Sequence, residues 1–240
     1  MTLKEMIFHR RSVRSYCADE VDETSMQAIR TFMAGLHPLL PGAGTEARII
    51  RTSQANFLQK WKTPHALAIF AEDCDDALIN VGFMYQQLDL YMQSLGLGSC
   101  WVGLGWLADG EPVPEGMRLA ILLPFGNPAG VPLRETSADF KRKALHEITD
   151  VPDVRLEVVR IAPSATNSQP WYFTHEADVI HVWREELGRI KQRTLGKMNP
   201  IDMGIALAHL YTANPERFVF SRWQEPPVRE GYIYVGSVKL

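Results

Sequence analysis

The sequence predicts an α+β fold made of two half-copies within one chain. Two observations predict it: helical and strand-like segments are mixed along the 240 residues, and three weakly similar pairs of segments recur in the same order. A chain of this length can bury one large core or two closely packed half-domains, which excludes a small disulfide-stapled scaffold.

Three segments are predicted to be helices. Residues 77–95 carry apolar side chains at three- and four-residue steps, and Gly96 follows as a helix stop. Residues 23–33 and 154–161 are the other two. The last of these ends before Pro163, because a proline ring disfavours helical geometry in the residue that precedes it.

Short apolar runs bounded by polar or turn residues predict four strands. They are residues 66–71, 119–123, 179–183 and 231–235.

The half-copies are predicted from three matches. Residues 80–83 resemble 202–205, residues 27–30 resemble 157–160, and the strand ending at Gly126 resembles the one ending at Gly236. The separations of 122, 130 and 110 residues are near half the chain length, and the order is kept. This favours an internal duplication, with chance similarity among amphipathic elements as the alternative.

Composition narrows the classes of protein. Hydrophobic residues make up 46% and charged residues 22%, as in ordinary globular proteins, and the net charge is -3. We therefore expect no attraction to nucleic acid or to an anionic membrane surface. The start of the chain lacks a secretory signal, and no apolar run reaches the roughly 20 residues that span a bilayer, so the cytoplasm is the expected location.

Cysteines and acidic residues give no metal-site pattern. The three cysteines are far apart and are expected to be reduced, mostly buried thiols, with a catalytic role for Cys100 as the weaker alternative. They are Cys17, Cys74 and Cys100. The carboxylates of Asp73, Asp75 and Asp76 lack the pattern of a calcium loop and are expected to cap the helix over 77–95. No metal is expected.

A basic cluster near the start of the chain is the first candidate site. Arg10, Arg11 and Arg14 surround Ser12, and guanidinium forks with a hydroxyl suit the oxygens of a phosphate. A solvated basic turn is the alternative interpretation.

The second candidate is the stretch APSATNSQPW over residues 162–171. A helix that stops at Pro163 leads into small hydroxyl and amide residues, which can offer hydrogen-bonding groups to a planar heteroaromatic ring. A capping turn bounded by prolines is the alternative.

The third candidate, GLGSCWVGLGW over residues 96–106, follows the long predicted helix. Repeated glycines let the backbone approach a flat ligand closely. The segment is not a dinucleotide fingerprint, because its glycines follow a helix rather than a strand. Trp101 and Trp106 either face a substrate or belong to the core. A basic group, Lys141 to Lys143, follows a GNP turn further on.

Together these segments resemble the nitroreductase family of flavoproteins, in order and over most of the chain. The resemblance rests on four segments: RRSVR, the long predicted helix followed by GLGSCWVG, the GNP turn with its basic pair, and APSATNSQPW. The resemblance implies a nitroreductase-like fold, in which each half-copy has a small, mostly antiparallel sheet flanked by helices.

The chain departs from the family in one respect. The family's APSxxNxQPW loop stands some tens of residues after RRSxR, whereas residues 33–44 read MAGLHPLLPGAG and the loop appears only in the second half. The family's homodimers build each FMN site from both subunits. We therefore expect a covalent mimic of that dimer, with one complete FMN site between residues 1–148 and the shortened half 149–240, and a degenerate mate.

The resemblance implies roles residue by residue. Arg10, Arg11 and Ser12 would hold the FMN phosphate, assisted by Arg142 or Lys143. Arg14 would lie at the pyrimidine edge of the flavin and stabilise its reduced form, with no obligate side-chain acid or base. The remaining contacts to the ring would come from Val102, Gly103, Leu104, Pro163, Ser164, Ala165, Asn167 and Gln169.

The implied function is an FMN-dependent oxidoreductase. It would use NADH or NADPH to reduce nitroaromatic, quinone or similar electrophilic acceptors by ping-pong hydride transfer. The alternatives are a non-catalytic FMN-binding protein for storage or sensing, and a flavin enzyme of the same fold that carries out dehalogenation or desaturation. The expected partners are a small-molecule acceptor and a nicotinamide donor. Because its halves mimic a dimer, the chain is expected to work as a monomer.

Overall fold

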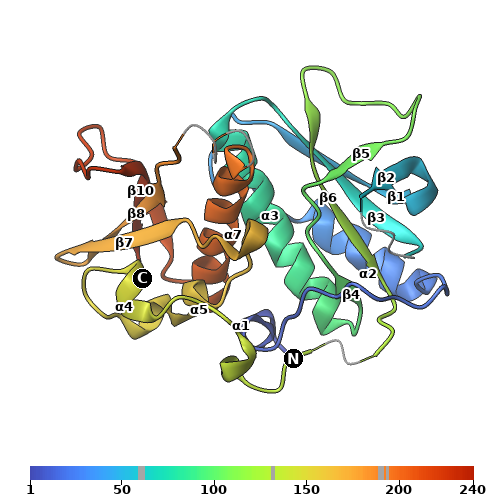
Figure 1. Cartoon of the computed structure of the whole chain (residues 1–240), viewed down its shortest axis with the longest axis horizontal. Coiled ribbons are helices and arrows are strands. Elements are labelled where there is room, and N and C mark those ends of the chain that lie inside the picture. Colours follow the sequence, from blue (N-terminus) through green and yellow to red (C-terminus); the bar gives the residue numbers. More distant parts are fainter. Residues whose placement is uncertain (59–62, 131–132, 189–191, 193–194) are drawn as a thin grey trace.

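The computed structural model describes residues 1–58, 63–130, 133–188, 192 and 195–240 (Figure 1). Its α-helices are α1 (Leu3–Ile7), α2 (Glu23–Ala34), α3 (Asp75–Ser94), α4 (Leu145–Ile148), α5 (Glu157–Arg160) and α7 (Met198–Ala213). Its strands are β1 (Thr45–Arg51), β2 (Ala55–Phe57), β3 (His65–Ala71), β4 (Gly98–Ser99), β5 (Gly105–Leu107), β6 (Arg118–Gly126), β7 (Trp171–Glu176), β8 (Val179–Glu185), β9 (Val219–Ser221) and β10 (Tyr232–Lys239).

Two four-stranded antiparallel sheets have the same topology. The first has the order β1-β3-β6-β4 and the second the order β7-β8-β10-β9. In each, a long helix follows the first two strands of the sheet, and the two remaining strands come after that helix. In the first sheet, a 3-10 turn (Thr52–Gln54) and β2 lie between β1 and β3. A third, two-stranded sheet pairs β2 with β5. The two large sheets therefore share one β-β-α-β-β order of elements.

The long helices α3 and α7 lie side by side between the two sheets (Figure 1). Their contact is reciprocal: a Cβ atom added at Gly82 would lie 2.0 Å from the carbonyl oxygen of Ile201, and one added at Gly204 would lie 2.0 Å from that of Ile79. Ile79 and Gly82 match Ile201 and Gly204 at the separation of 122 residues found in the sequence. A pseudo-twofold axis therefore passes between the two glycines.

One hydrophobic core runs through both halves. It includes side chains of α1, α2, both central helices and both large sheets, among them Leu88, Leu207, Phe125 and Phe173. The helices α3 and α7 are covered on nearly every side, so most of their residues are buried, including polar residues of α3, and neither helix is strongly amphipathic. The smaller cluster around Phe70 fills the other face of the first sheet.

The predicted helices and strands are confirmed with modest shifts. Residues 77–95 form α3, which begins two residues earlier at Asp75, and residues 23–33 form α2. The segment 154–161 begins with a 3-10 turn, Val154–Leu156, before α5. The strand predicted at 231–235 continues to Lys239 as β10.

The expected capping role of the three aspartates is wrong. Cys74 is the N-cap residue of α3 and makes no side-chain capping bond. Asp75 and Asp76 lie inside the first turn, where a carboxylate favours the helix dipole, and they pair with Arg184 and Arg222 of the second half at 2.7 Å. Asp73 pairs with Arg118. The carboxylates of Asp75 and Asp76 therefore join the two halves, whereas the Asp73 pair stays within the first half.

The cysteines are free thiols, but the expectation that they are mostly buried holds only for Cys100. Cys17 is half-buried and Cys74 is exposed, since an N-cap position at the surface leaves its side chain in solvent. In the described part of the chain, no three His, Cys, Asp or Glu side chains gather as a metal site requires. None of the helices described is long and apolar enough to cross a membrane.

Candidate functional site

A cavity of about 860 Å³ lies between the two halves. Its volume is in the upper part of the range of about 300–1,000 Å³ usual for ligand sites. The first half contributes Ser12, Arg14, residues 100–104 and Ile121. The second half contributes residues 163–166, Leu195, Met198, Ile201, Asp202 and Ile205. The three motifs predicted from the sequence therefore meet at one place.

The loop after α5 is held in an unusual conformation. Thr166, Asn167 and Gln169 have positive φ angles of 51°, 60° and 48°, in a region that residues other than glycine seldom occupy. Within the loop, the backbone N–H of Gln169 donates to Ser164 Oγ at 2.9 Å. The loop is thus folded around its own hydroxyl and amide groups, which presents Pro163 and Ser164 to the cavity.

Two basic residues fix this loop from behind. Arg142 donates from Nε to the carbonyl oxygen of Ala162 at 3.0 Å and from Nη1 to Asn167 Oδ1 at 2.6 Å. Lys143 donates from its backbone N–H to Gln169 Oε1 at 2.8 Å and from Nζ to the Gln169 carbonyl at 3.2 Å. The basic pair therefore anchors the loop, and neither residue lines the cavity.

A buried polar network lies beneath the basic cluster. Arg10, only 1% exposed, donates from Nε to Asp89 Oδ2 at 3.1 Å, and the Asp89 carboxylate is fully buried in the middle of α3. The same carboxylate accepts from Gln86 Nε2 and Gln93 Nε2, each at 3.0 Å, and from Ser99 Oγ. These four partners satisfy both oxygens of the Asp89 carboxylate, so Arg10 is held rigidly.

The network reaches the cavity wall through two of its members. Gln93 Oε1 accepts from the backbone N–H of Arg11 at 2.8 Å, which fixes the chain just before Ser12. Gln86 Oε1 accepts from Trp101 Nε1 at 3.0 Å, which orients the Trp101 ring at the cavity. The buried side of α3 therefore positions segments that are far apart in the sequence.

Side chains alternate along residues 12–14, as in an extended chain. Ser12 and Arg14 line the cavity, whereas Val13 between them is buried on the other side. Arg11 is exposed and, with Ser12 and Arg14, borders an adjacent hollow of about 360 Å³. Arg14 is exposed at the rim and donates to the Ser12 carbonyl at 3.5 Å.

Positive charge accumulates around Arg10, behind the cavity wall at Ser12. Burial and the nearby charge of Arg10 lower the pKa of Arg142 to about 10, and burial with the charges of Arg10 and Arg11 lowers that of Arg134 to about 10. Arg134 and Arg142 form no ion pair with any carboxylate of the described chain. An anion bound here would relieve this repulsion.

The segment after α3 forms the opposite wall. Val102 is tied to Leu122 by backbone hydrogen bonds of 2.9 and 3.3 Å, so its position is set by β6. Gly103 lies against the thioether of Met198, where an added Cβ would come within 2.8 Å of Sδ. Burial raises the pKa of the Cys100 thiol, which keeps it protonated rather than nucleophilic.

A buried carboxyl, Asp202, lies in the wall formed by α7 and is only 3% exposed. Its Oδ1 accepts from the backbone N–H of Ala165 at 3.0 Å, and Ser168 Oγ lies 3.5 Å from Oδ2. Burial raises the pKa of Asp202 to about 8. The group is therefore largely protonated at neutral pH.

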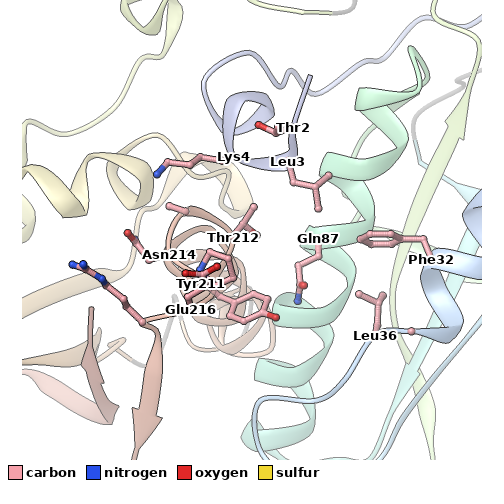
Figure 2. A pocket seen from close by; sticks show the side chains of 14 residues that line it. Thr2, Leu3, Lys4, Phe32, Leu36, Gln87, Tyr211, Thr212, Asn214 and Glu216 are labelled. Carbon is pink, nitrogen blue, oxygen red and sulfur yellow. The ribbon is translucent and has the colours of Figure 1, made fainter.

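A second cavity, of about 750 Å³, lies at the far end of α7 (Figure 2). Gln87 and Tyr211 come from the two central helices, and Phe32 and Leu36 lie beyond Gln87. None of the site residues predicted from the sequence lines it.

The structure thus divides the predicted site residues into two groups. Those that line the cavity between the halves are Ser12, Arg14, Val102, Gly103, Leu104, Pro163, Ser164 and Ala165. Those that lie behind or beside its wall are Arg10, Arg11, Arg142, Lys143, Asn167 and Gln169.

Asp202 and the network of Gln86, Asp89 and Gln93 were not predicted as site residues from the sequence. A signal for the network was present, because these three polar residues fall at helical spacing on one side of an otherwise apolar segment. Asp202 likewise interrupts an apolar helix at the place that matches Asn80.

Comparison with known proteins gives one family. A model of the family described as "Putative TM nitroreductase" matches residues 2–214. A "putative nitroreductase" from Thermotoga maritima is 21% identical in sequence, with 99% of this chain and 92% of that chain covered and a TM-score of 0.65. The nitroreductase-like fold predicted from the sequence is thereby confirmed.

Two further solved structures are similar over a smaller part of the chain. A nitroreductase family protein from Clostridium difficile is 16% identical over 61% of this chain and 95% of its own, with a TM-score of 0.47. A nitroreductase with bound FMN from Bacteroides fragilis is 18% identical over 53% of this chain and 89% of its own, with a TM-score of 0.44. A search among curated proteins gave no match.

Proposed function

The chain belongs to the nitroreductase family whose model spans residues 2–214, and from this premise we propose that it is an FMN-dependent oxidoreductase that passes electrons from NADH or NADPH to quinone or nitroaromatic acceptors. The observation that carries the proposal is the cavity between the halves. Both sets of motif residues border it, and its volume of about 860 Å³ leaves room for a flat cofactor with a second ligand above it.

The residues present fit FMN. Guanidinium charge accumulates around Arg10, behind the cavity wall at Ser12, which suits a phosphate. Burial and the charges of neighbouring arginines lower the pKa of Arg134 and of Arg142 to about 10. The middle is walled by the backbone around Gly103 and by the apolar side chains of Met198 and Ile205, which suits a ring system. When bound, FMN would supply hydride transfer.

We assign the phosphate end to Ser12 and Arg11, with Arg10 acting from beneath. Arg10 cannot approach a ligand freely, because Asp89 holds its Nε, but its charge lies next to Ser12, whose hydroxyl is 3.4 Å from Nη2. Arg142 and Lys143 would act indirectly, by holding the loop that carries Asn167 and Gln169.

Arg14 is the residue proposed to act on the reaction itself. It is exposed at the rim of the cavity and has no carboxylate partner among the described residues, so its guanidinium is free to face negative charge that develops in the site. A cation placed there stabilises a reduced, anionic ring relative to the oxidised one. Pro163, Ser164 and Ala165 would contact the ring from the other half.

A ping-pong order follows from the shared cavity. The donor and the acceptor would both have to approach the same reactive edge beside residues 102–104, so the oxidised donor has to leave before the acceptor binds. Trp101, held by Gln86, and Leu104, which is 62% exposed, lie where such a ligand would enter.

The two half-copies give the proposal its architecture. We infer that residues 1–148 and 149–240 are diverged copies of one ancestral unit, supported by the matching order of strands in the two large sheets and the reciprocal contact of Gly82 with Gly204. A single chain then supplies both sides of the site, and a monomer is sufficient for activity.

The test is turnover by the purified, FMN-loaded protein with NADH and NADPH, using a quinone and a nitroaromatic as acceptors. Arg14→Ala should lower kcat/KM by about tenfold to a hundredfold while retaining most of the bound FMN, because one charge-stabilising group is lost. Arg30→Ala, which removes an exposed arginine of α2, is the matched control and should change neither. Bound FMN without turnover would indicate an FMN-binding protein that is not an enzyme of this kind. Protein that takes up no FMN would refute the proposal.

A further inference from the structure

Asp202 has a counterpart across the pseudo-twofold axis. Asn80 occupies the matching position of α3, 122 residues earlier, and its Oδ1 accepts from the backbone N–H of Leu40 at 2.9 Å. Asp202 Oδ1 accepts from the backbone N–H of Ala165 at 3.0 Å. In both halves, a side-chain oxygen near the start of the long helix holds the loop that precedes the sheet.

The two positions differ in what else surrounds them. Asn80 is fully buried, and its amide nitrogen donates to the carbonyl oxygens of Leu40 at 2.8 Å and Ala43 at 3.1 Å. Asp202 instead borders the cavity, and its second oxygen has only Ser168 Oγ at 3.5 Å, which is a long contact. An amide is therefore sufficient to hold the loop, and the presence of an acid beside the cavity has to be explained differently.

The surroundings keep this acid in its neutral form. The described chain places no arginine, lysine or histidine within ion-pair distance of Asp202, and burial raises its pKa to about 8. The other titratable side chains that line the cavity are Arg14 and Cys100, both from the first half. His209, whose pKa burial lowers to about 3, lies seven residues further along α7. At neutral pH, Asp202 thus carries a proton next to the ligand site.

We propose that Asp202 is the general acid of the cavity and delivers a proton to the electron acceptor. The inference rests on the proposed oxidoreductase function and names a reacting group for it. A buried, neutral acid in the wall of a ligand cavity, with a pKa near the working pH, is well suited to donate a proton in the transition state.

The proton and electron balance can be written for a quinone. The nicotinamide donor supplies, through the cofactor, one hydride, which carries both electrons and one of the two hydrogens that the quinone gains. The O–H bond of Asp202 breaks as a new O–H bond forms on the quinone oxygen, and the product is the hydroquinone. The aspartate left behind takes up a proton from solvent before the next cycle.

The variant Asp202→Asn tests the proposal, because Asn80 shows that an amide can fill this position and keep the loop. FMN content and the rate of flavin reduction by the nicotinamide donor should stay within about twofold of wild type. Turnover with 1,4-benzoquinone should fall at least tenfold, in keeping with the 10²–10⁴-fold contribution usual for general acids. Turnover with ferricyanide, which accepts an electron without a proton, should change by less than about twofold.

The pH profile adds a second readout. Quinone turnover by the wild type should fall as pH rises through about 8, because the acid must be protonated, and the profile of Asp202→Asn should be flat there. Asp178→Asn, the same change at an exposed carboxylate that pairs with Lys239, is the matched control and should behave as wild type.

A third readout does not depend on turnover. Infrared difference spectra of the wild type between pH 6 and 9.5 should show loss of a protonated carboxyl band that Asp202→Asn lacks. If Asp202→Asn lost the same fraction of turnover with quinone and with ferricyanide, Asp202 would be a positioning residue and not the general acid. Unchanged quinone turnover, or a carboxyl already ionised at pH 6, would overturn the proposal. A wild type that binds no FMN or turns over neither acceptor would instead refute the oxidoreductase function on which it rests.

Discussion

Asp89 shows how a single buried charge supports the site. Its carboxylate pairs with Arg10 at 3.1 Å, and both side chains are almost completely buried. Removing one partner of such a pair leaves the other charge buried and uncompensated. We predict that Asp89→Ala lowers the free energy of unfolding by about 3–5 kcal/mol.

Chemical denaturation measures this effect, and a surface pair provides the control. Glu23 and Arg30 form an exposed ion pair on α2, so Glu23→Ala should cost no more than about 0.5 kcal/mol. Similar losses for the two variants would mean that the network around Asp89 is not a stabilising element.

The raised pKa of Asp202 predicts how the free energy of unfolding depends on pH. Its pKa in the folded protein, about 8, lies above the ordinary value of 3.8, so between these values the folded state holds a proton that the unfolded chain has released. Stability should therefore fall as pH rises through this window, with a contribution from this group of up to about 1.4 kcal/mol per pH unit.

The comparison of wild type with Asp202→Asn isolates that contribution. Unfolding free energies measured at intervals from pH 5 to pH 8 should show a steeper decline for the wild type than for the variant. Parallel curves would indicate that Asp202 is ionised in the folded protein.

At the scale of elements, the crossing of α3 and α7 depends on two glycines. A Cβ at Gly204 would lie 2.0 Å from a backbone oxygen of α3, so Gly204→Ala has to push the helices apart. We predict a loss of about 1–3 kcal/mol, even though alanine is the better helix former. Because Ile201, Asp202 and Ile205 lie on the same helix and line the cavity, bound FMN should decrease as well.

Thermal unfolding and flavin content measure both effects. Gly188→Ala is the matched control, because a Cβ added there meets nothing within 4 Å, and its stability should stay within about 0.5 kcal/mol of wild type. Normal stability and flavin content in Gly204→Ala would contradict the close helix contact.

The elements show how far the sequence carries a prediction of this fold. The long helix was evident from periodicity, since apolar side chains recur at three- and four-residue steps along α3, which ends before Gly96. Strand β1 was not predicted, because it is an edge strand whose sequence, TEARIIR, carries three charged residues and alternates weakly. Local patterns do not encode which edge a sheet leaves open to solvent.

The site was predicted in part for a similar reason. The motifs identified which segments meet, and Ser12, Arg14, Gly103 and Ser164 do line the cavity. The motifs do not tell which side chains of a segment face inward. Arg10 instead points away from the cavity and pairs with Asp89 of α3. The two residues are 79 positions apart, so no local sequence pattern predicts this contact.

At the scale of the whole molecule, pseudo-symmetry gives the proposed site between the halves a mirrored position, which we predict binds no FMN. The position that mirrors the cavity is bordered by the aromatic rings of Phe83, Tyr211 and Phe218, which pack on one another at centroid distances of 5.4 to 6.3 Å. Nearby, Arg222 forms an ion pair with Asp76. Asp76 stands 122 residues before Met198 of the cavity wall and so occupies the matching position. The hollow that the three rings border with residues 35–39 is about 320 Å³, less than half of the 860 Å³ of the cavity between the halves.

The measurement that tests this account most directly is the amount of FMN bound per chain, from the visible spectrum of the purified protein and the flavin released from it. The account predicts one FMN per chain, with two absorption bands typical of an oxidised flavin. Two per chain would show that the mirrored position also binds the cofactor. No flavin, even after reconstitution, would contradict the central claim that the cavity between the halves is a flavin site.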